Sequence, residues 1–321
     1  MASLKAIRKR IISVKSTQKI TRAMKMVAGA RLNRAQQRIT ELRPYAVKLG
    51  DVLDEITRQP LATVSPEGAG PPPAVATHTT AEGYEVIGEK PSHPLLVERP
   101  EKRVLLVVLT SDRGLCGAFN TNINKRGERE WRSRESEGQE VKLLLIGRKG
   151  RDYFTRRSAP ILSYLPGVWD KLGLDTAREV GAKILEPFMK DEVDAIYLVY
   201  NEFKSAMSQN LVVERLLPID HELQASERQT ESGRAAEFMF EPDKGVLLER
   251  LVPMYVEISI LRALYESMAS ELGARMTAMD SATKNAKEMI ESLTLLYNKA
   301  RQAAITKELM EIVGGTEALK E

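Results

Sequence analysis

Residues 13–38, SVKSTQKITRAMKMVAGARLNRAQQR, decide how the chain begins to fold. The stretch has no aspartate, glutamate or proline, so one basic helix can run through it unbroken. The apolar positions around it, spaced by three and four with one stutter, are Leu4, Ile7, Ile11, Val14, Ala28, Leu32, Ala35, Ile39, Leu42, Ala46, Leu49, Leu53 and Ile56. So narrow a seam is typical of a coiled coil. Because the seam continues in phase past Pro44, we expect a kinked or partner-supported helix there, not a helix end.

A second seam of the same kind runs from Met254 to Ala300, with one gap across Arg275, and Gly314 and Gly315 are predicted to end its helix. At 1.5 Å per residue the two helices would be about 80 and about 105 Å long. Neither length fits inside a globule of this mass. We therefore predict that the two ends of the chain pair as an antiparallel coiled coil, with the last turns of the longer C-terminal helix projecting beyond the N-terminus.

A compact unit is predicted between the two helices. Its apolar runs RVLLVVL, VKLLLI and VDAIYLVY are continuous and separated by polar helices, a pattern typical of a mostly parallel sheet covered on both faces. PILSYLP is predicted as a short third strand, and QNLVVERLLP closes the unit. The predicted fold class is α/β: a Rossmann-like, mostly parallel α/β domain inserted between two long terminal helices that form an antiparallel coiled coil.

The chain therefore divides into six predicted segments. They are an N-terminal coiled-coil helix (1–58), a Pro-rich flexible insertion (59–100), the α/β domain (101–220), a polar connector and foot (221–243), a C-terminal coiled-coil helix (244–315) and a tail (316–321). Eight of the fifteen prolines fall between residues 60 and 100, so this insertion buries too little surface to offset the entropy of ordering it. It is either a tolerated surface insert or a contact or regulatory loop.

Several classes of function lack support in the composition. No apolar run is long enough to span a membrane, and the N-terminus is too charged for a signal peptide and leaves no transit segment. The single cysteine, Cys116, allows no internal disulfide, fits a reducing compartment and is predicted to be a small buried side chain. His78, His93 and His221 show no metal-ligand spacing. We predict no catalytic residues, no metal and no cofactor.

The loop TSDRGLCGAFN after the first strand is a weak match to a phosphate-binding turn. Gly114 and Gly117 frame the start of a helix, where backbone amides can hold an anion, but the loop fits neither GxGxxG nor GxxxxGK[ST]. It leaves one alternative function open, a nucleotide-binding α/β enzyme with coiled-coil arms. Asp112 and Arg113 are expected to form a local ion pair or a contact with another subunit.

Positive charge is concentrated at the N-terminus, where residues 1–43 hold twelve lysines or arginines against one acid, Glu41. A nucleic-acid reader would want a recognised module or exposed aromatic residues, and a membrane-surface helix would want a bulkier apolar face. We therefore predict that the basic surface meets acidic protein partners and not nucleic acid.

Three motifs resemble one family closely: STQKITRAMKMVA near the N-terminus, TSDRGLCGAFN in the α/β domain, and YNKARQAAITKELMEIVGG near the C-terminus. Their order and spacing are similar to those of the gamma subunit of bacterial F-type (F1Fo) ATP synthase. The resemblance covers about residues 1–58 and 101–315 and implies a non-catalytic central rotor stalk. Such a stalk transmits torque between the proton-driven c-ring and the catalytic alpha3-beta3 ring, also contacts the epsilon subunit, and is peripheral on the cytoplasmic face of the bacterial inner membrane.

The same resemblance implies where partners touch the chain. Residues implied to meet the beta subunits are Arg22, Met24, Lys25, Arg301, Gln302, Thr306 and Glu308. Residues implied to form a foot near the c-ring and epsilon are Phe240, Glu241 and Asp243. Two departures stand out: the Pro-rich insertion, and Cys116 as the only cysteine, so the thiol switch of chloroplast relatives is not expected.

Overall fold

The computed structural model describes residues 4–58, 93–219 and 244–318 of the 321-residue chain. The helices are α1 (Leu4–Arg58), the short 3-10 helix η1 (Pro94–Leu96), α2 (Phe119–Ser136), α3 (Arg148–Thr155), α4 (Leu174–Met189) and α6 (Lys244–Ala318). The strands are β1 (Arg103–Leu109), β2 (Glu140–Ile146), β3 (Ile161–Leu165), β4 (Ala195–Phe203) and β5 (Gln209–Leu217). No helix within these ranges combines the length and the apolar composition that crossing a bilayer requires.

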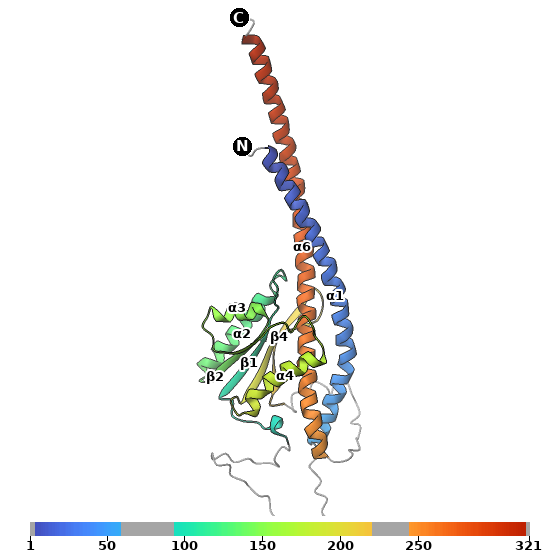
Figure 1. The fold of residues 1–321 in the computed structure, drawn as a ribbon, viewed down its shortest axis with the longest axis vertical. Coiled ribbons are helices and arrows are strands. Elements are labelled where there is room, and N and C mark those ends of the chain that lie inside the picture. Colours follow the sequence, from blue (N-terminus) through green and yellow to red (C-terminus); the bar gives the residue numbers. More distant parts are fainter. Residues whose placement is uncertain (1–3, 59–92, 220–243, 319–321) are drawn as a thin grey trace, which may run out of the picture.

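The two terminal helices lie side by side and run in opposite directions, as predicted (Figure 1). The α1 residues buried along the pair are Ile7, Ala28, Leu32, Ala35, Leu49, Leu53 and Ile56. Thr21, which is also buried, lies where the apolar pattern stutters. A polar residue thus replaces an apolar one on the seam, and the helix itself is uninterrupted.

The longer α6 continues past the N-terminus of α1 as a single helix, as predicted (Figure 1). Its large apolar side chains there are exposed, among them Ile305, Leu309, Met310 and Ile312. This projecting segment therefore has apolar surface with no cover within the described chain.

Helix ends follow the sequence less closely than helix interiors. Pro44 lies inside α1, as expected, and it is exposed. The prediction that Gly314 and Gly315 end the last helix is wrong, because α6 runs on to Ala318. Glycine weakens a helix by about 1 kcal/mol relative to alanine, but it can adopt helical dihedral angles and does not force an end.

The five strands form one sheet in the order β3-β2-β1-β4-β5. Strands β1 to β4 are mutually parallel and β5 is antiparallel to β4, so the prediction of a mostly parallel sheet is confirmed. The apolar run 104–109 of β1 is almost completely buried, as a central strand covered on both faces must be.

The two faces of the sheet have different covers. Val104, Leu106 and Val108 point to one side, where they pack with residues of α2 and α3. Leu105 and Val107 point to the other side, into a core that also includes residues of α4 and α6 and the lower end of α1. Helix α6 is therefore both half of the coiled coil and part of the cover of the sheet.

One prediction about the Pro-rich insertion is wrong at its C-terminal end. Residues 93–97 are folded onto the main core, with Leu95 and Leu96 buried. The Nδ1 atom of His93 accepts a hydrogen bond from the Leu95 amide at 3.2 Å and caps the turn. The apolar pair supplies enough burial to order this short piece despite its prolines. Residues 59–92 and 220–243 lie outside the described residues.

Candidate functional site

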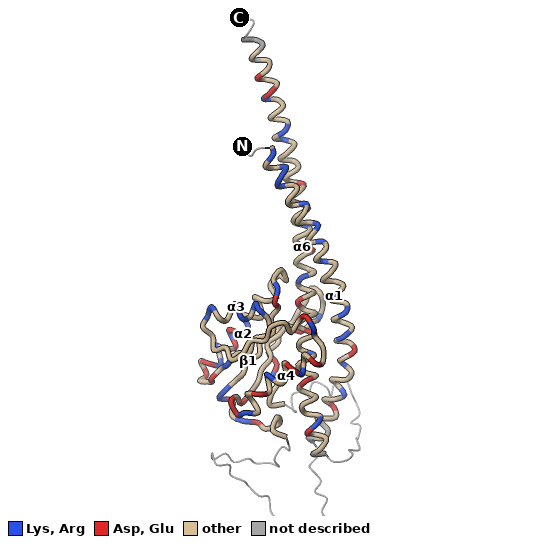
Figure 2. The backbone as a smooth tube through the Cα atoms, viewed as in Figure 1, with Lys and Arg blue, Asp and Glu red and all other residues tan. Residues whose placement is uncertain are grey.

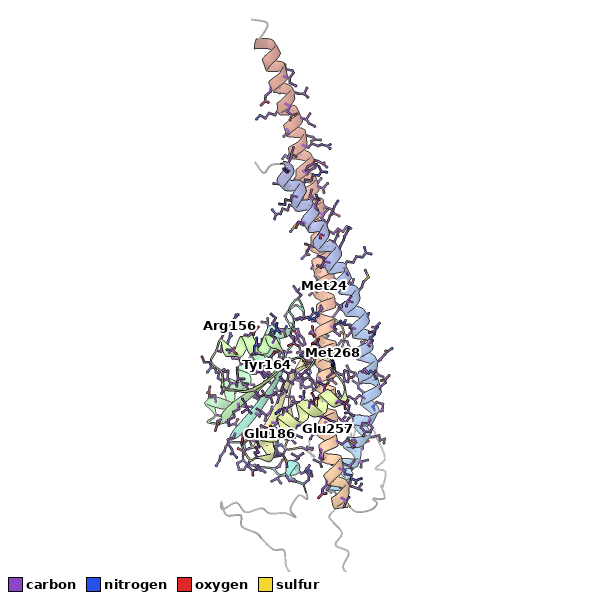
Figure 3. All side chains as sticks on the ribbon, in the orientation of Figure 1. Met24, Arg156, Tyr164, Glu186, Glu257 and Met268 are labelled. Carbon is purple, nitrogen blue, oxygen red and sulfur yellow. The ribbon has the colours of Figure 1, made fainter. Side chains whose placement is uncertain are left out.

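A groove of about 830 Å³ lies where the coiled coil meets the α/β domain. One wall is α1, the floor is α6, and the opposite wall is formed by the loops that follow β1 and β3. These loops leave the carboxyl ends of parallel strands, the edge at which α/β domains commonly bind their ligands. Figure 3 labels Met24 on α1 and Met268 on α6, both of which line the groove.

The walls of the groove are held in place by hydrogen bonds. Trp169, in the loop after β3, donates from Nε1 to the Thr110 carbonyl at 2.8 Å. Tyr265 of α6 donates from its hydroxyl to the Leu172 carbonyl at 3.3 Å. The second loop is thus fixed both to the end of β1 and to α6, so the groove is formed before any partner arrives.

The groove has an excess of positive charge. Five arginines line it: Arg31, Arg34, Arg38, Arg113 and Arg275. Arg275 pairs with Glu271, and Arg38 lies 3.5 Å from Glu41, but within the described ranges the other three guanidinium groups form no ion pair. Unpaired guanidinium groups beside an apolar floor suit an acidic protein segment that also has apolar side chains.

Asp112 and Arg113 both lie in the groove wall but do not pair with each other among the described residues, contrary to one of the two expectations for them. Asp112 accepts a hydrogen bond from the Arg148 amide at 2.8 Å, which ties the loop after β1 to the start of α3. Arg113 is left to face the groove. Its position favours the other expectation, a contact with another subunit.

In the loop that weakly matches a phosphate-binding turn, polar groups form hydrogen bonds with other groups of the same chain. Ser111 donates its amide to Asn120 Oδ1 at 2.9 Å, and Cys116 is buried beside both, as predicted. Burial is the main reason that the pKa of the Cys116 thiol is raised. Gly117 has a positive φ of 57°, and a Cβ there would lie 3.8 Å from Ala278 of α6. This loop packs against the coiled coil, which favours a structural role over nucleotide binding.

A polar layer crosses the coiled coil at the end of the groove nearest the N-terminus of α1. The hydroxyl oxygens of Thr21 and Thr283 are 2.8 Å apart, and Lys25 Nζ donates to Asp280 Oδ1 at 2.5 Å. The Lys25 hydrogen bond, followed by that of Lys284, holds the pKa of Asp280 below its ordinary value. At pH values above the ordinary pKa of aspartate, ionised Asp280 therefore stabilises this contact. That contribution to stability is lost as the pH falls through the lowered pKa of Asp280.

The three N-terminal residues implied to meet a beta subunit have different surroundings. Arg22 is exposed, Met24 is half-buried in the groove wall, and Lys25 is held by Asp280 of α6. Only Met24 belongs to the groove. Lysine and arginine residues nevertheless occur along the whole length of α1, as the blue segments of Figure 2 show.

The four implied contact residues near the C-terminus lie far from the groove. Arg301, Gln302, Thr306 and Glu308 are all exposed on the projecting segment of α6. Phe240, Glu241 and Asp243 lie outside the described residues. No group of three or more potential metal ligands occurs in the described parts of the chain.

Comparison with known proteins identifies the family. A family model described as ATP synthase matches residues 3–319. An ATP synthase gamma chain from Sorangium cellulosum is 69% identical, and one from Geobacter metallireducens is 45% identical, each over the full length of both chains. The chain belongs to the ATP synthase gamma chain family.

Solved structures share the fold of this gamma-chain family member. A chain of the Euglena gracilis mitochondrial ATP synthase matches with a TM-score of 0.62 at 21% identity, covering 98% of this chain and 94% of that one. A central-stalk chain of the Tetrahymena thermophila enzyme matches with a TM-score of 0.56 at 24% identity, covering 82% and 99%. At these identities the likeness concerns the fold.

The gamma-chain resemblance did not single out the groove arginines. Arg31, Arg34 and Arg113 come from two segments that are about 80 residues apart, and nothing in the local sequence says that they converge. The available signal was the unbalanced charge of residues 1–43, which predicted an acidic partner without locating it.

Proposed function

We propose that the chain is the central rotor stalk of a bacterial F1Fo ATP synthase. In this role it transmits torque between a proton-driven c-ring and a catalytic alpha3-beta3 ring during ATP synthesis or hydrolysis. The observation that carries the proposal is α6, a single 75-residue helix that covers the sheet at one end and projects alone at the other. In this proposal catalysis belongs to the beta subunits, and the chain takes part as a non-catalytic subunit of the complex.

Torque can pass through α6 because its lower half is buried on several sides. Val256, Ala263 and Leu264 are completely buried in the core that the helix shares with the sheet and α4. A rotation imposed on the α/β domain must therefore turn α6 with it, because close-packed interfaces slip only at a large cost. The exposed tip then turns inside the alpha3-beta3 ring.

The asymmetry of the stalk supplies the coupling. Each beta subunit has open and closed states, and a partner that touches one of them more favourably shifts the balance between them. Since the three beta subunits meet different faces of the stalk, they are biased differently at any moment. Rotation moves each one through the states in turn.

The basic groove is the proposed contact for an acidic segment of a beta subunit, together with Arg22, Met24 and Lys25. Charge acts over several ångströms and attracts a partner without a deep apolar anchor, so the contact can form and release repeatedly. On the tip, Arg301, Gln302, Thr306 and Glu308 are the proposed second set of beta contacts.

The lower end is proposed to meet the c-ring and the epsilon subunit through Phe240, Glu241 and Asp243. This arrangement makes the chain a peripheral subunit on the cytoplasmic face of the bacterial inner membrane, in contact with the membrane only through the complex.

Reconstitution tests the proposed function. Purified alpha and beta subunits are mixed with the full chain, and the product is separated by size and assayed for ATP hydrolysis. We expect the chain to co-elute with both subunits, and the complex to hydrolyse ATP faster than alpha and beta alone. A chain that elutes by itself, with no change in hydrolysis, would rule the proposal out.

Neutralising the groove is expected to slow assembly. Changing Arg31, Arg34 and Arg113 together to glutamine should reduce the association rate with alpha3-beta3 by about tenfold or more at low ionic strength, because steering by charge accelerates association by that order. The rates are measured by stopped-flow fluorescence, and the difference should shrink in high salt.

A matched control removes the same charge elsewhere. Lys125, Arg129 and Arg156 are exposed on α2 and just after α3, on the side of the sheet that α6 does not cover, and Figure 3 places Arg156 far from the coiled coil. Their triple glutamine variant should associate within about twofold of the unmodified chain. Equal slowing by both variants would show that net charge matters and the groove does not.

A further inference from the structure

A cluster of charged side chains, most of them half-buried, joins α6 to the sheet below the groove. Arg262 of α6 pairs with Glu214 of β5, which also accepts a hydrogen bond from the Tyr200 hydroxyl of β4 at 2.6 Å. Two turns further along α6, Ser270 donates to the Asn201 carbonyl at 3.1 Å. These side chains are the polar ties between the long helix and the β4–β5 edge of the α/β domain.

Glu266 lies between these ties and has no comparable partner. It follows Arg262 by one helical turn, it is only 7% exposed, and its Oε2 atom is buried without a hydrogen-bond partner in the described structure. Burying an ionised carboxylate in such a place costs much free energy, whereas burying a neutral carboxyl group costs far less.

The charges that face Glu266 come from every element packed around it. On the negative side are Glu202 of β4 and Glu214 of β5, and on the positive side are Arg262 of α6 and Arg43 of α1. Three carboxyl groups thus face two guanidinium groups. Glu202 is half-buried and bonded to Asn210, and Glu214 is held by Arg262 and Tyr200, so Glu266 is the member left to keep a proton.

We propose that Glu266 is a proton-sensitive latch between α6 and the α/β domain, closed when its carboxyl group is neutral and loosened when that group is ionised. The latch does not depend on the proposed rotor function. On ionisation, Glu266 competes with Glu214 for Arg262, which lies one helical turn before Glu266 on α6 and acts on it electrostatically. The tie from α6 to β5 then weakens, and the β4–β5 edge separates more easily from the long helix.

The expected proton affinity agrees with this geometry. Burial is the main cause that raises the pKa of Glu266 to about 7; Arg262 opposes the rise, and Glu202 and Glu214 add to it. A raised pKa means that the folded chain binds this proton more tightly than the unfolded chain does. Its contribution to stability is therefore full below the ordinary pKa of glutamate, and it declines as the pH rises towards 7.

The test compares the full chain with its Glu266→Gln variant, which keeps the neutral shape at every pH. Between pH 5.5 and 7.5, the unfolding equilibrium constant of the unmodified chain relative to the variant should rise about twentyfold, the change that this pKa shift implies. Hydrogen exchange of peptides from β5 should differ least between the two proteins at pH 5.5, and by pH 8 exchange in the unmodified chain should have become several-fold faster relative to the variant.

Glu288→Gln is the matched control, because Glu288 is an exposed glutamate on the same helix. This variant should follow the unmodified chain at every pH. If the unfolding equilibrium constant of the unmodified chain, divided by that of Glu266→Gln, stays the same from pH 5.5 to 8, the latch is overturned.

A second measurement keeps the proposal testable if Glu266→Gln does not fold. Carbon-13 labelling of glutamate side chains in the unmodified chain should reveal one carboxyl signal that titrates near neutral pH, well apart from the others. If every glutamate carboxyl signal titrates below pH 5.5, the proposal is wrong.

Discussion

Replacing Gly147 with alanine is expected to lower the free energy of unfolding by more than about 3 kcal/mol. Gly147 joins β2 to α3 with φ 94° and ψ 143°, a backbone conformation that residues other than glycine rarely adopt. An added Cβ would lie 2.0 Å from the Thr110 carbonyl oxygen, far inside van der Waals contact. Thr110 cannot move aside easily, because its amide bonds to the Ile146 carbonyl at 2.8 Å and its carbonyl accepts from Trp169.

Gly138→Ala separates the two causes of this loss. Gly138 also has a positive φ, 85°, but nothing lies within 4 Å of its added Cβ. It should therefore show only the conformational cost, about 1–2 kcal/mol. Both variants are compared with the unmodified chain by urea denaturation followed by circular dichroism. Similar losses in the two variants would mean that the contact with Thr110 relaxes and is not the reason for glycine at position 147.

Replacing Ala269 with glutamate is expected to separate the two long helices beside the groove. Ala269 is completely buried and packs in one cluster with Leu32, Ala35 and Leu272. The neighbours of Ala269 in that cluster are apolar side chains, so the new carboxylate would be buried against apolar surface. We expect the free energy of unfolding to fall by about 3–5 kcal/mol, the usual loss when a buried charge lacks its partner.

The same change at an exposed position of α6 provides the control. Ala303→Glu lies on the projecting segment, where the added side chain reaches solvent, and should change the stability of the isolated chain by less than about 0.5 kcal/mol. If Ala269→Glu also proved neutral, the long helices would have to separate readily at this level, and a stalk that transmits torque would be excluded. Calorimetric unfolding of the two variants side by side distinguishes these outcomes.

The sequence predicted the architecture because it repeats simple patterns over long stretches. The seam from Leu4 to Ile56 has a period that only a helix with one narrow contact can satisfy, and the unbroken apolar run 104–109 fits only a strand buried on both faces. Both signals are local, so they need no knowledge of the partner segment. The projection of α6 then followed from the difference in the two helix lengths.

Features that depend on distant contacts could not be predicted in this way. Ser267 and Ser270 are polar residues off the predicted seam, yet both are completely buried, because α6 has the sheet on one side and α1 on another. The seam analysis allowed for one contact face only. The groove could not be predicted from the sequence for the same reason, since Arg31 and Arg113 come together only after the α/β domain docks on α6.

The distance along the chain between α1 and α6 has a consequence for biosynthesis. At ribosomal rates of 5–20 residues per second, about 10–40 s pass between completion of Arg58 and the first turn of α6. The α/β strands can assemble in that interval, whereas Leu32 and its apolar neighbours on α1 remain exposed to solvent until α6 is made. Two nascent α1 segments on adjacent ribosomes could pair through these bare residues, but their shared positive charge repels them. Charge repulsion between α1 helices therefore opposes their self-association until α6 of the same chain has been synthesised.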